Sequence, residues 1–487
     1  MDIELNIDPF GFWENLTDFL FRDPITIAID IFLNGGWVVF VIALIVGLYL
    51  FWLSGRRKKF AGKWKHVLLA IDIPKNNEQS PKAVENIFMA LAATQSGGNL
   101  IDNYWDGKVQ ESFSFEVVSL EGYIQFLVRT PSHFRDLIEA SIYAQYPDAE
   151  ITEVDDYAVR FSELRFPSDT HGLWGSDMVL VRDYPYPIRT YNDFINPITR
   201  GIVPGMAPVG NFLDPMAALL EVMSRFGPGE QAWIQLIVTP MPPGWDSKAE
   251  RVVKELMGEK YEAPESLSVK AISKPLGVLS GIGDSVTRAI APELTGKEAS
   301  AEDKKDAKMT MVQVDALKGI QMKLAKHGMN LKFRFVYLAE NEVFDKGKGV
   351  AGVIGAIQQF NTNNANGFKP GSKSKTGADY FRVKKRVAKK QNEILENYIN
   401  RDSQSGDKAD NMMFNTEELA SLWHFPVISV KAPAMERISS RKVIPPTRLP
   451  FEERNITGGG LSTDSGDSNL SVDDDVTPQP PANLPTG

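Results

Sequence analysis

The most distinct hydrophobic pattern in the chain is an uncharged run near its N-terminus. Residues 36–53 read GWVVFVIALIVGLYLFWL, eighteen residues without a charged side chain. As a helix, a run of this length spans roughly 27 Å, close to the hydrocarbon thickness of a bilayer. Trp37 and Trp52 stand near its two ends, where aromatic rings favour the headgroup layer. The pattern predicts a transmembrane helix over residues 36–54.

The charges on the two sides of this run predict its orientation. Arg56, Arg57, Lys58 and Lys59 follow it directly, whereas residues 1–35 carry seven acids and a single Arg. By the positive-inside rule, residues 1–35 form a short extracytoplasmic segment and the body is cytoplasmic. A cleaved signal peptide would need basic residues before the run and a small-residue cleavage site after it, and neither is present. We expect a single-pass protein of the cell membrane.

Behind the anchor, residues 55–160 alternate between strand and helix patterns. Strand patterns have apolar residues at every second position or in a short buried run, and helix patterns have them at every third or fourth position. We expect strands at residues 66–73, 112–118, 123–129 and 149–154, and helices at residues 81–93 and 131–145. The order β-α-β-β-α-β is that of the split βαβ, or ferredoxin-like, unit. The fold class is therefore predicted to be α+β.

Part of this pattern recurs in residues 161–450, which predicts a second related α+β unit. The strand IQFLVRTP ends at Pro131 and the similar strand IQLIVTP ends at Pro240. A charged insertion over residues 242–308 interrupts the second unit, because it is too rich in charge, Gly and Pro for a compact connection. Its remaining elements are a helix at residues 309–326, a strand at residues 331–338 and a helix at residues 350–360.

Two polar segments near the C-terminal end differ in charge. Residues 451–487 carry seven acids and one Arg among many Ser, Pro and Gly residues, so we expect a disordered acidic tail. It could act as a spacer or as a partner-binding segment. Residues 369–401 instead hold ten Lys or Arg against three acids, and we expect a basic helix there.

The basic helix contains the candidate binding residues of this chain. They are Arg382, Lys384, Lys385, Arg386, Lys389 and Lys390, with Phe381 and Tyr398 as nearby aromatics. Such a density of positive charge suits contacts with phosphate groups. Three interpretations remain open at this point: a solvated helix face, a contact for an acidic protein or anionic lipid, and a contact for nucleic acid.

Motifs of catalysis are scarce. The chain has no cysteine, which excludes thiolate metal sites and a cysteine nucleophile, and its five histidines form no metal-binding pattern. Gly347, Gly349 and Gly352 match G-x-G-x-x-G, but residues 340–346 separate them from the preceding strand and the region twenty residues on is basic. These glycines more simply allow close helix packing. We predict a protein that is not an enzyme and has no metal or cofactor.

A longer resemblance connects the body to a known family. Residues 214–238, DPMAALLEVMSRFGPGEQAWIQLIV, resemble the N-terminal, non-ATPase region of HerA/FtsK-type type IV secretion ATPases from Patescibacteria-like bacteria. Similar blocks occupy residues 73–74, 96–99, 146–153, 333–338, 359–361, 366–370 and 415–426. In such proteins an ATPase domain usually follows a Pro-Pro-x-x-Leu-Pro element, here residues 445–450, whereas this chain continues into its acidic tail. The resemblance therefore implies a body that lacks the C-terminal motor domain.

Together these patterns predict a non-catalytic, membrane-anchored component of a type IV secretion-like or conjugative DNA-transfer system. Its expected partners are membrane lipid, a separately encoded HerA-like ATPase and further copies of the chain. The alternative is a membrane-tethered protein that binds DNA or another nucleic acid through residues 369–401.

Overall fold

The computed structural model describes residues 32–33, 37–74, 77–194, 213–242, 244–245, 247–258, 310–362, 364–409 and 411–427. Nearly all of the predicted extracytoplasmic segment, most of the charged insertion, the Pro-Pro-x-x-Leu-Pro element and the predicted acidic tail lie outside these residues. The described residues belong to one compact unit. We therefore describe the anchor, the sheet and the helices packed on it.

The first repeat has the predicted strand and helix order. It consists of β1 (His66–Asp72), α4 (Pro81–Ala92), β2 (Phe113–Leu120), β3 (Tyr123–Pro131), α5 (Arg135–Gln145) and β4 (Glu150–Glu153). Its strands pair antiparallel in the order β4-β1-β3-β2, which is the arrangement of a ferredoxin-like unit. The α+β prediction is confirmed.

The second repeat has the same topology, although its elements are spread over a longer stretch of chain. It consists of β5 (His171–Leu180), α7 (Pro215–Ser224), β6 (Glu230–Pro240), β7 (Gly328–Glu340), α11 (Gly352–Gln358) and β8 (Phe368–Pro370). The strand order β8-β5-β7-β6 matches β4-β1-β3-β2 position by position. Two helices, α8 (Ser247–Leu256) and α10 (Met311–Leu324), lie in the connection between β6 and β7.

One detail of the predicted repeat is wrong. The similar strands that end at Pro131 and Pro240 occupy different places, since β3 is the third strand of its repeat and β6 is the second. β6 is almost fully buried, β3 is mostly buried, and both end at Thr-Pro, so the likeness reflects burial and a shared strand end. The true counterpart of β6 is β2.

The two repeats join through these counterpart strands. β2 and β6 pair antiparallel, with Glu116 opposite Gln235, and so fuse both halves into one continuous sheet. A short strand, β9 (Met413–Asn415), adds to β7, and the described chain then has nine strands in this sheet. Residues distant in sequence therefore meet at the centre of the molecule.

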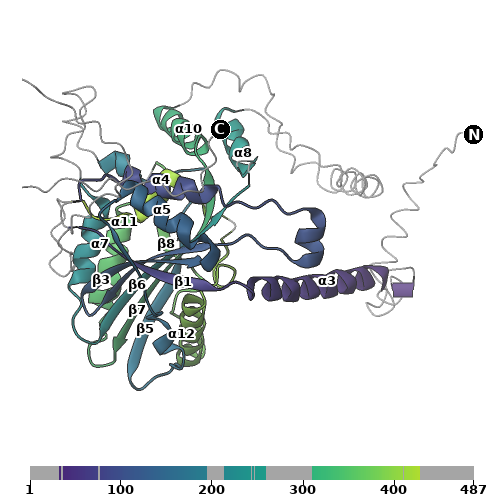
Figure 1. Cartoon of the computed structure of the whole chain (residues 1–487). Coiled ribbons are helices and arrows are strands. Elements are labelled where there is room, and N and C mark those ends of the chain that lie inside the picture. The colour runs from purple at the N-terminus through teal and green to yellow at the C-terminus, as the bar shows by residue number, and fades with distance from the viewer. Residues whose placement is uncertain are drawn as a thin grey trace, which may run out of the picture. The chain divides into compact units, whose positions relative to one another are not determined.

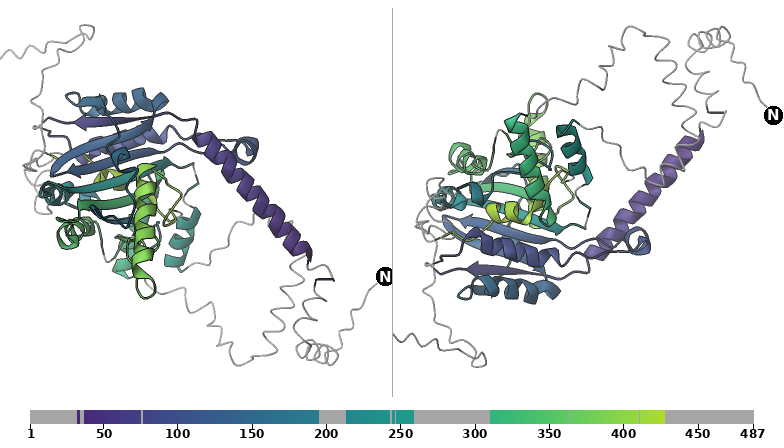
Figure 2. Two further views of the ribbon diagram at one scale, coloured as in Figure 1. Left: turned by 90° about the horizontal axis from the view of Figure 1, so that it is seen from below. Right: turned by 90° about the horizontal axis from the view of Figure 1, so that it is seen from above.

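Helices cover both faces of the sheet (Figures 1 and 2). One face packs against α4, α5, α7, α11 and α13 (Thr416–Leu422), which contribute Phe88, Ile138, Leu219, Ile357 and Leu419 to the larger apolar core. The opposite face packs against α12 (Val383–Ile399), which contributes Ile394, Leu395 and Tyr398 to a second core. The predicted basic helix therefore exists, over a shorter range than residues 369–401.

The predicted anchor is a helix, α3 (Trp37–Ala61), which continues eight residues past Leu53 and includes the basic residues. Its stretch Phe40–Ala61 is long and apolar enough to cross a membrane, and only 6% of that apolar window is buried within the protein. Four residues connect α3 to β1, so the anchor leads directly into the first repeat (Figure 1).

Candidate docking surface at the N-terminal end of helix α12

The C-terminal half of α12 is fixed to the sheet by a row of buried polar side chains. Glu116, Gln235, Arg334 and Asp177 lie side by side on the neighbouring strands β2, β6, β7 and β5. Arg334 Nη1 donates to Gln235 Oε1 at 2.9 Å, and Arg334 Nε donates to Asp177 Oδ1 at 3.0 Å. The same guanidinium donates to the carbonyl oxygen of Asn397, in the last turns of α12.

Arg401 completes this network from just beyond the helix. Its Nε and Nη2 donate to Glu116 at 3.0 and 3.2 Å, and it also pairs with Asp156. Tyr157 donates to Glu116 Oε2 at 2.9 Å and lies 2.6 Å from the hydroxyl of Tyr398. Burial by itself would raise the pKa of Glu116, but the charge and hydrogen bonds of Arg401 hold that pKa below its usual value. Glu116 is therefore an ion-paired carboxylate.

The chain leaves α12 through a turn that glycine usually forms. Arg401 has φ of 53°, its amide donates to the carbonyl of Tyr398, and the amide of Asp402 donates to that of Asn397. This is the Schellman pattern, in which the left-handed residue is usually Gly because a side chain costs roughly 1–2 kcal/mol there. Arginine at this position brings its guanidinium to Glu116.

The N-terminal end of α12 has the opposite character. Its first turn contains no acidic residue, and its N-cap, Arg382, makes no capping bond with its side chain. Tyr380 and Arg382 have φ of 67° and 48°, a region that costs non-glycine residues energy. Because a helix N-terminus carries a partial positive charge, the cations at this end repel it.

The six predicted binding residues differ in how free they are. Arg382, Lys384, Lys385, Arg386 and Lys389 are exposed, and Lys390 is half-buried. Lys390 donates to the carbonyls of Ser372 and Lys375, Arg386 donates to that of Asp379, and Lys389 lies 3.6 Å from Glu393. Among the described residues, Lys384 and Lys385 have no acidic side chain within 4.0 Å. The free charge is thus concentrated in the first turn.

The aromatic residues named with this segment also separate. Tyr380 is 98% exposed and Phe381 is 71% exposed, directly before the basic turn, and the guanidinium of Arg382 lies 5.0 Å from the ring of Phe381. Tyr398 is fully buried against Trp233 and belongs to the core, so its place in a binding surface was predicted wrongly. We define the α12 basic surface as residues 380–386.

The comparisons with known proteins give a family. A family model described as "Domain of unknown function (DUF8128)" matches residues 61–437, more than half of the 487 residues. The chain belongs to the DUF8128 family. No curated protein and no solved structure matches it.

The DUF8128 match includes the α12 basic surface and begins at the last residue of α3. The predicted anchor-flank residues therefore precede it. Trp37 and Trp52 are exposed on α3, as are Arg57, Lys58 and Lys59, whereas Arg56 is half-buried and donates to the carbonyl of Trp105 at 3.2 Å. The structure thus brings flank residues into contact with the family domain, since the ring of Trp52 also packs against that of Trp105.

The glycine-rich segment of the DUF8128 domain has a packing role in this structure. A side chain at Gly349 would meet the ring of Tyr337 at 2.4 Å, and one at Gly352 would meet Val222 at 2.9 Å. The neighbouring Lys348 pairs with Glu230. These contacts agree with the simpler interpretation of the G-x-G-x-x-G match, in which glycines let a helix lie close to the sheet.

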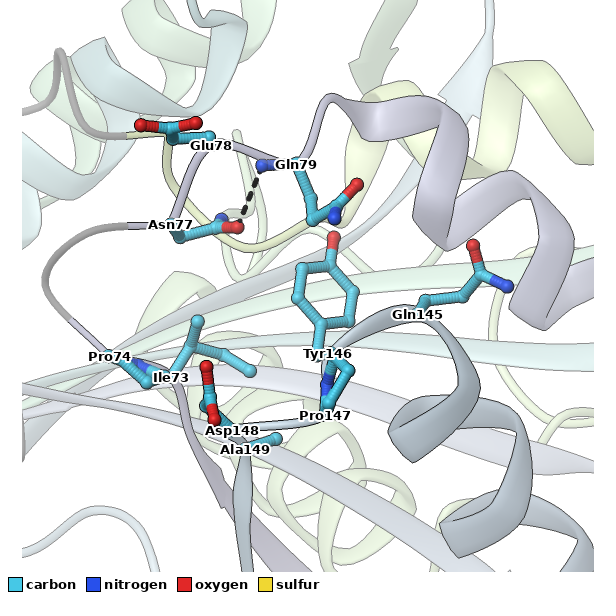
Figure 3. Close-up of a pocket in the computed structure, with 10 residues that line it drawn as sticks. All are labelled: Ile73, Pro74, Asn77, Glu78, Gln79, Gln145, Tyr146, Pro147, Asp148 and Ala149. Atoms are coloured by element: carbon cyan, nitrogen blue, oxygen red, sulfur yellow. Dashed lines mark hydrogen bonds between the residues drawn. The ribbon is translucent and has the colours of Figure 1, made fainter. Parts of the chain in front are cut away.

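A small pocket lies at the end of β1 and α5 (Figure 3). Its volume is about 180 Å³, and its lining includes Asn77, Gln79, Gln145 and Tyr146. The hydroxyl of Tyr146 has no hydrogen-bond partner among the described residues, and burial together with the charge of Asp214 raises its pKa, so it stays a neutral donor. This arrangement can hold water molecules and contains no nucleophile with an adjacent base.

The end of the described chain is held beside this pocket. Asn77 Nδ2 donates to the carbonyl of Pro426 at 3.0 Å, and the amide of Val427 donates to Asp214 Oδ2 at 3.0 Å. His424 lies 2.9 Å from Asp214 Oδ1 and is fully buried. The described chain is therefore fixed to the body as far as Val427.

Proposed function

We propose that this chain is a non-catalytic, membrane-anchored docking component of a type IV secretion-like or DNA-transfer apparatus. Its body binds a separately encoded HerA-like ATPase through the α12 basic surface. The observation that carries the proposal is the first turn of α12, where exposed Lys384 and Lys385 follow a strained backbone and have no acidic partner among the described residues. The proposal assigns this surface to the cytoplasmic side of a cell membrane, which the basic residues after the apolar run support by the positive-inside rule.

The energetics of the first turn favour an anionic partner. Each cation at a helix N-terminus costs about 0.3–1 kcal/mol, and the isolated protein recovers none of this from an acidic residue in that turn. An acidic protein surface would supply the missing counter-charge and turn this cost into binding energy. Residues that break the usual preferences of a helix terminus without a compensating contact are typical of functional sites.

The rigid support of α12 also suits docking. Ile394, Leu395 and Tyr398 are buried, and the network around Glu116 fixes the helix to the shared sheet. A surface held this way loses little conformational entropy when a partner binds. The anchor, four residues before β1, would then transmit the position of the membrane to the docked motor.

The resemblance to HerA/FtsK-type secretion ATPases supplies the identity of the partner. In that family the related region and the motor lie in one polypeptide, and we propose that this body acts together with a motor of the same class. A gene for an ATPase of this class beside the gene for this chain would support the proposal further.

The proposal is tested by affinity capture of the full-length protein from native membranes. The wild-type protein should recover a HerA-like ATPase, and Lys384→Glu/Lys385→Glu/Arg386→Glu should recover at least tenfold less. Arg160→Glu/Lys318→Glu/Lys346→Glu is the matched control, because it reverses three exposed charges elsewhere. Capture of no ATPase by wild type, under conditions that preserve other secretion complexes, would contradict the proposal.

A second candidate function, nucleic-acid binding, is favoured by Tyr380 and Phe381. Exposed aromatic rings beside cations are the combination that single-stranded nucleic acids use, since bases stack on the rings and phosphates contact the charges. DNA affinity should then fall steeply with salt, and the triple α12 reversal should flatten that dependence. Weak binding with the same salt slope in wild type and variant would eliminate this candidate.

A further inference from the structure

A loop of the first repeat, residues 98–107, lies against the end of α3. The Tyr49 hydroxyl donates to the carbonyl of Tyr104 at 3.0 Å, and the Arg56 side chain donates to the carbonyl of Trp105 and to Asp106. The rings of Trp52 and Trp105 have centroids 5.3 Å apart. All three views show this loop, which contains the short π-helix Asp102–Asp106, beside the helix (Figures 1 and 2).

The loop approaches the helix closely enough to require a glycine. Gly107 has φ of 70°, and a Cβ there would lie 2.8 Å from the amide nitrogen of Arg57 and 2.9 Å from Arg56. Distances this short to backbone atoms leave no room for a side chain. The loop is therefore built to pack on α3.

The polar groups of the loop are used internally. The amide of Asp102 donates to the Asn99 side chain at 2.8 Å, and the Asp102 side chain accepts from the amide of Asn99. Asn103 donates to the carbonyl of Gly98, and the Asp106 carboxylate pairs with Arg56 at 3.4 Å. A loop whose polar side chains bond to the loop itself and to α3 is compatible with a weakly hydrated environment.

Its large apolar side chains are mostly exposed. Leu100, Ile101, Tyr104 and Trp105 are 76%, 65%, 53% and 62% exposed. Four large apolar side chains within six residues form a patch of the kind that marks an interaction site. Nothing in the described body covers them.

The position of the patch along α3 identifies what covers it. Tyr49 and Arg56 mark the contacts with the loop, and the seven residue steps from one to the other span about 10 Å along the helix axis. This stretch includes Trp52, and the exposed basic residues 57–59 follow it. Aromatic rings followed by cations mark the layer where hydrocarbon meets headgroups. The loop thus lies at the level of a membrane interface.

We propose that residues 98–107 form a second membrane contact, which inserts Leu100, Ile101, Tyr104 and Trp105 into the interfacial layer of the bilayer that α3 spans. The depth over which the loop follows α3 agrees with the 5–10 Å at which interfacial elements bury their apolar side chains. The basic residues 57–59 on the adjacent helix suit anionic headgroups. With two contacts instead of one, the body has a fixed orientation on the membrane.

This inference concerns how the body sits on lipid and does not depend on which partner binds α12. Because the chain contains no cysteine, single cysteines can be introduced and labelled in the full-length protein. Leu100→Cys reports on the loop, Leu44→Cys reports on the span, and Val343→Cys is the control. Val343 is exposed and follows β7. The strand ends at which β7 finishes are opposite to those at which β1 begins.

Each variant carries an environment-sensitive fluorophore and is placed in phosphatidylcholine/phosphatidylglycerol nanodiscs with lipids that bear a quencher near the headgroup. The proposal expects strong quenching at position 100 and none at position 343. A quencher at the acyl-chain end should reach position 44. Equal behaviour of positions 100 and 343 would overturn the proposal, as would an unquenched label at position 44, since no bilayer would then surround α3.

The same samples distinguish a protein that covers the apolar patch from lipid that covers it. If a second copy covered the patch, position 100 would escape the lipid quencher and would cross-link between copies, which would also overturn the proposal. A second variant tests the orientation. Leu100→Asp/Ile101→Asp should leave the protein in nanodiscs through α3, while the distance from a label at position 343 to the lipid surface changes from one narrow distribution to a broad one. An unchanged narrow distribution would contradict a role of the loop in orientation.

Discussion

The two ends of α12 both carry cationic residues, but these are buried and ion-paired at one end and exposed at the other. Each end has an arginine with positive φ, Arg382 at the start and Arg401 just after the end. At the C-terminal end, Arg401 is buried and its strain is offset by bonds to Glu116 and Asp156. At the N-terminal end, Arg382 is exposed beside two lysines without an acidic partner among the described residues. The comparison shows that charge in this protein serves structure where it is matched and is available for binding where it is not.

The largest expected effect comes from breaking the matched end. Glu116→Ala leaves Arg401 buried beside a cavity, and loss of one partner of a buried ion pair costs about 3–5 kcal/mol. We expect a fall of many degrees in the melting temperature of the full-length protein in detergent. Glu163→Ala removes an exposed carboxylate and serves as the control. Equal melting temperatures for both variants would show that the network does not stabilise the fold.

A smaller effect isolates the strain at the same end. Arg401→Gly and Arg401→Ala both remove the guanidinium, but only glycine adopts positive φ without cost. The glycine variant should therefore be more stable than the alanine variant by about 1 kcal/mol, although both should be less stable than wild type. The melting temperatures of the two variants test this prediction. A melting temperature of Arg401→Ala equal to or above that of Arg401→Gly would contradict the left-handed turn.

Burial of His66 at the start of β1 should also make stability depend on pH. Burial, with the charges of Arg129 and Arg401, lowers the pKa of His66 to about 4, below its ordinary value of 6.5. Between these values the unfolded chain binds a proton that the folded protein does not, so stability is lost as pH falls from 6.5 toward 4. The melting temperature of His66→Gln should depend less on pH over this window than that of wild type. An unchanged pH dependence would mean that other groups cause it.

The smallest effect on stability is expected at the N-terminal end of α12, where the cations have no acidic partner among the described residues. Lys384→Glu/Lys385→Glu/Arg386→Glu replaces repulsion with attraction toward the helix N-terminus, so the melting temperature should stay equal or rise slightly, by the equivalent of a few tenths of a kcal/mol per charge. The same variant should lose its partner. A large fall in melting temperature would mean that these cations support the fold.

The sequence predicted the fold to the extent that local periodicity determines it. The elements of the first repeat follow within a few residues because apolar spacing is regular in α4, β2 and β3. The second repeat was harder, since α8, α10 and the chain between them separate β6 from β7 and hide the pairing of β6 with β2. The likeness between β3 and β6 then suggested the wrong correspondence.

The candidate site was predicted in part. The density of Lys and Arg indicated residues 382–390, yet the spacing could not show that Lys390 binds backbone carbonyls or that Tyr398 is buried. The pairing of Arg401 with Glu116 joins residues 285 positions apart and leaves no local pattern. The apolar residues of the loop at 98–107 are visible in the sequence, but the sequence could not show that this loop contacts α3. The proposed membrane contact depends on that observation.

The central claim is that the α12 basic surface is where a motor docks, and site-specific cross-linking tests it most directly. A photoreactive phenylalanine analogue at Phe381, in full-length protein in native membranes, should attach covalently to a HerA-like ATPase. The same analogue at Tyr123, an exposed aromatic on β3, should not. Identical products from both positions, or no ATPase from position 381, would contradict the claim.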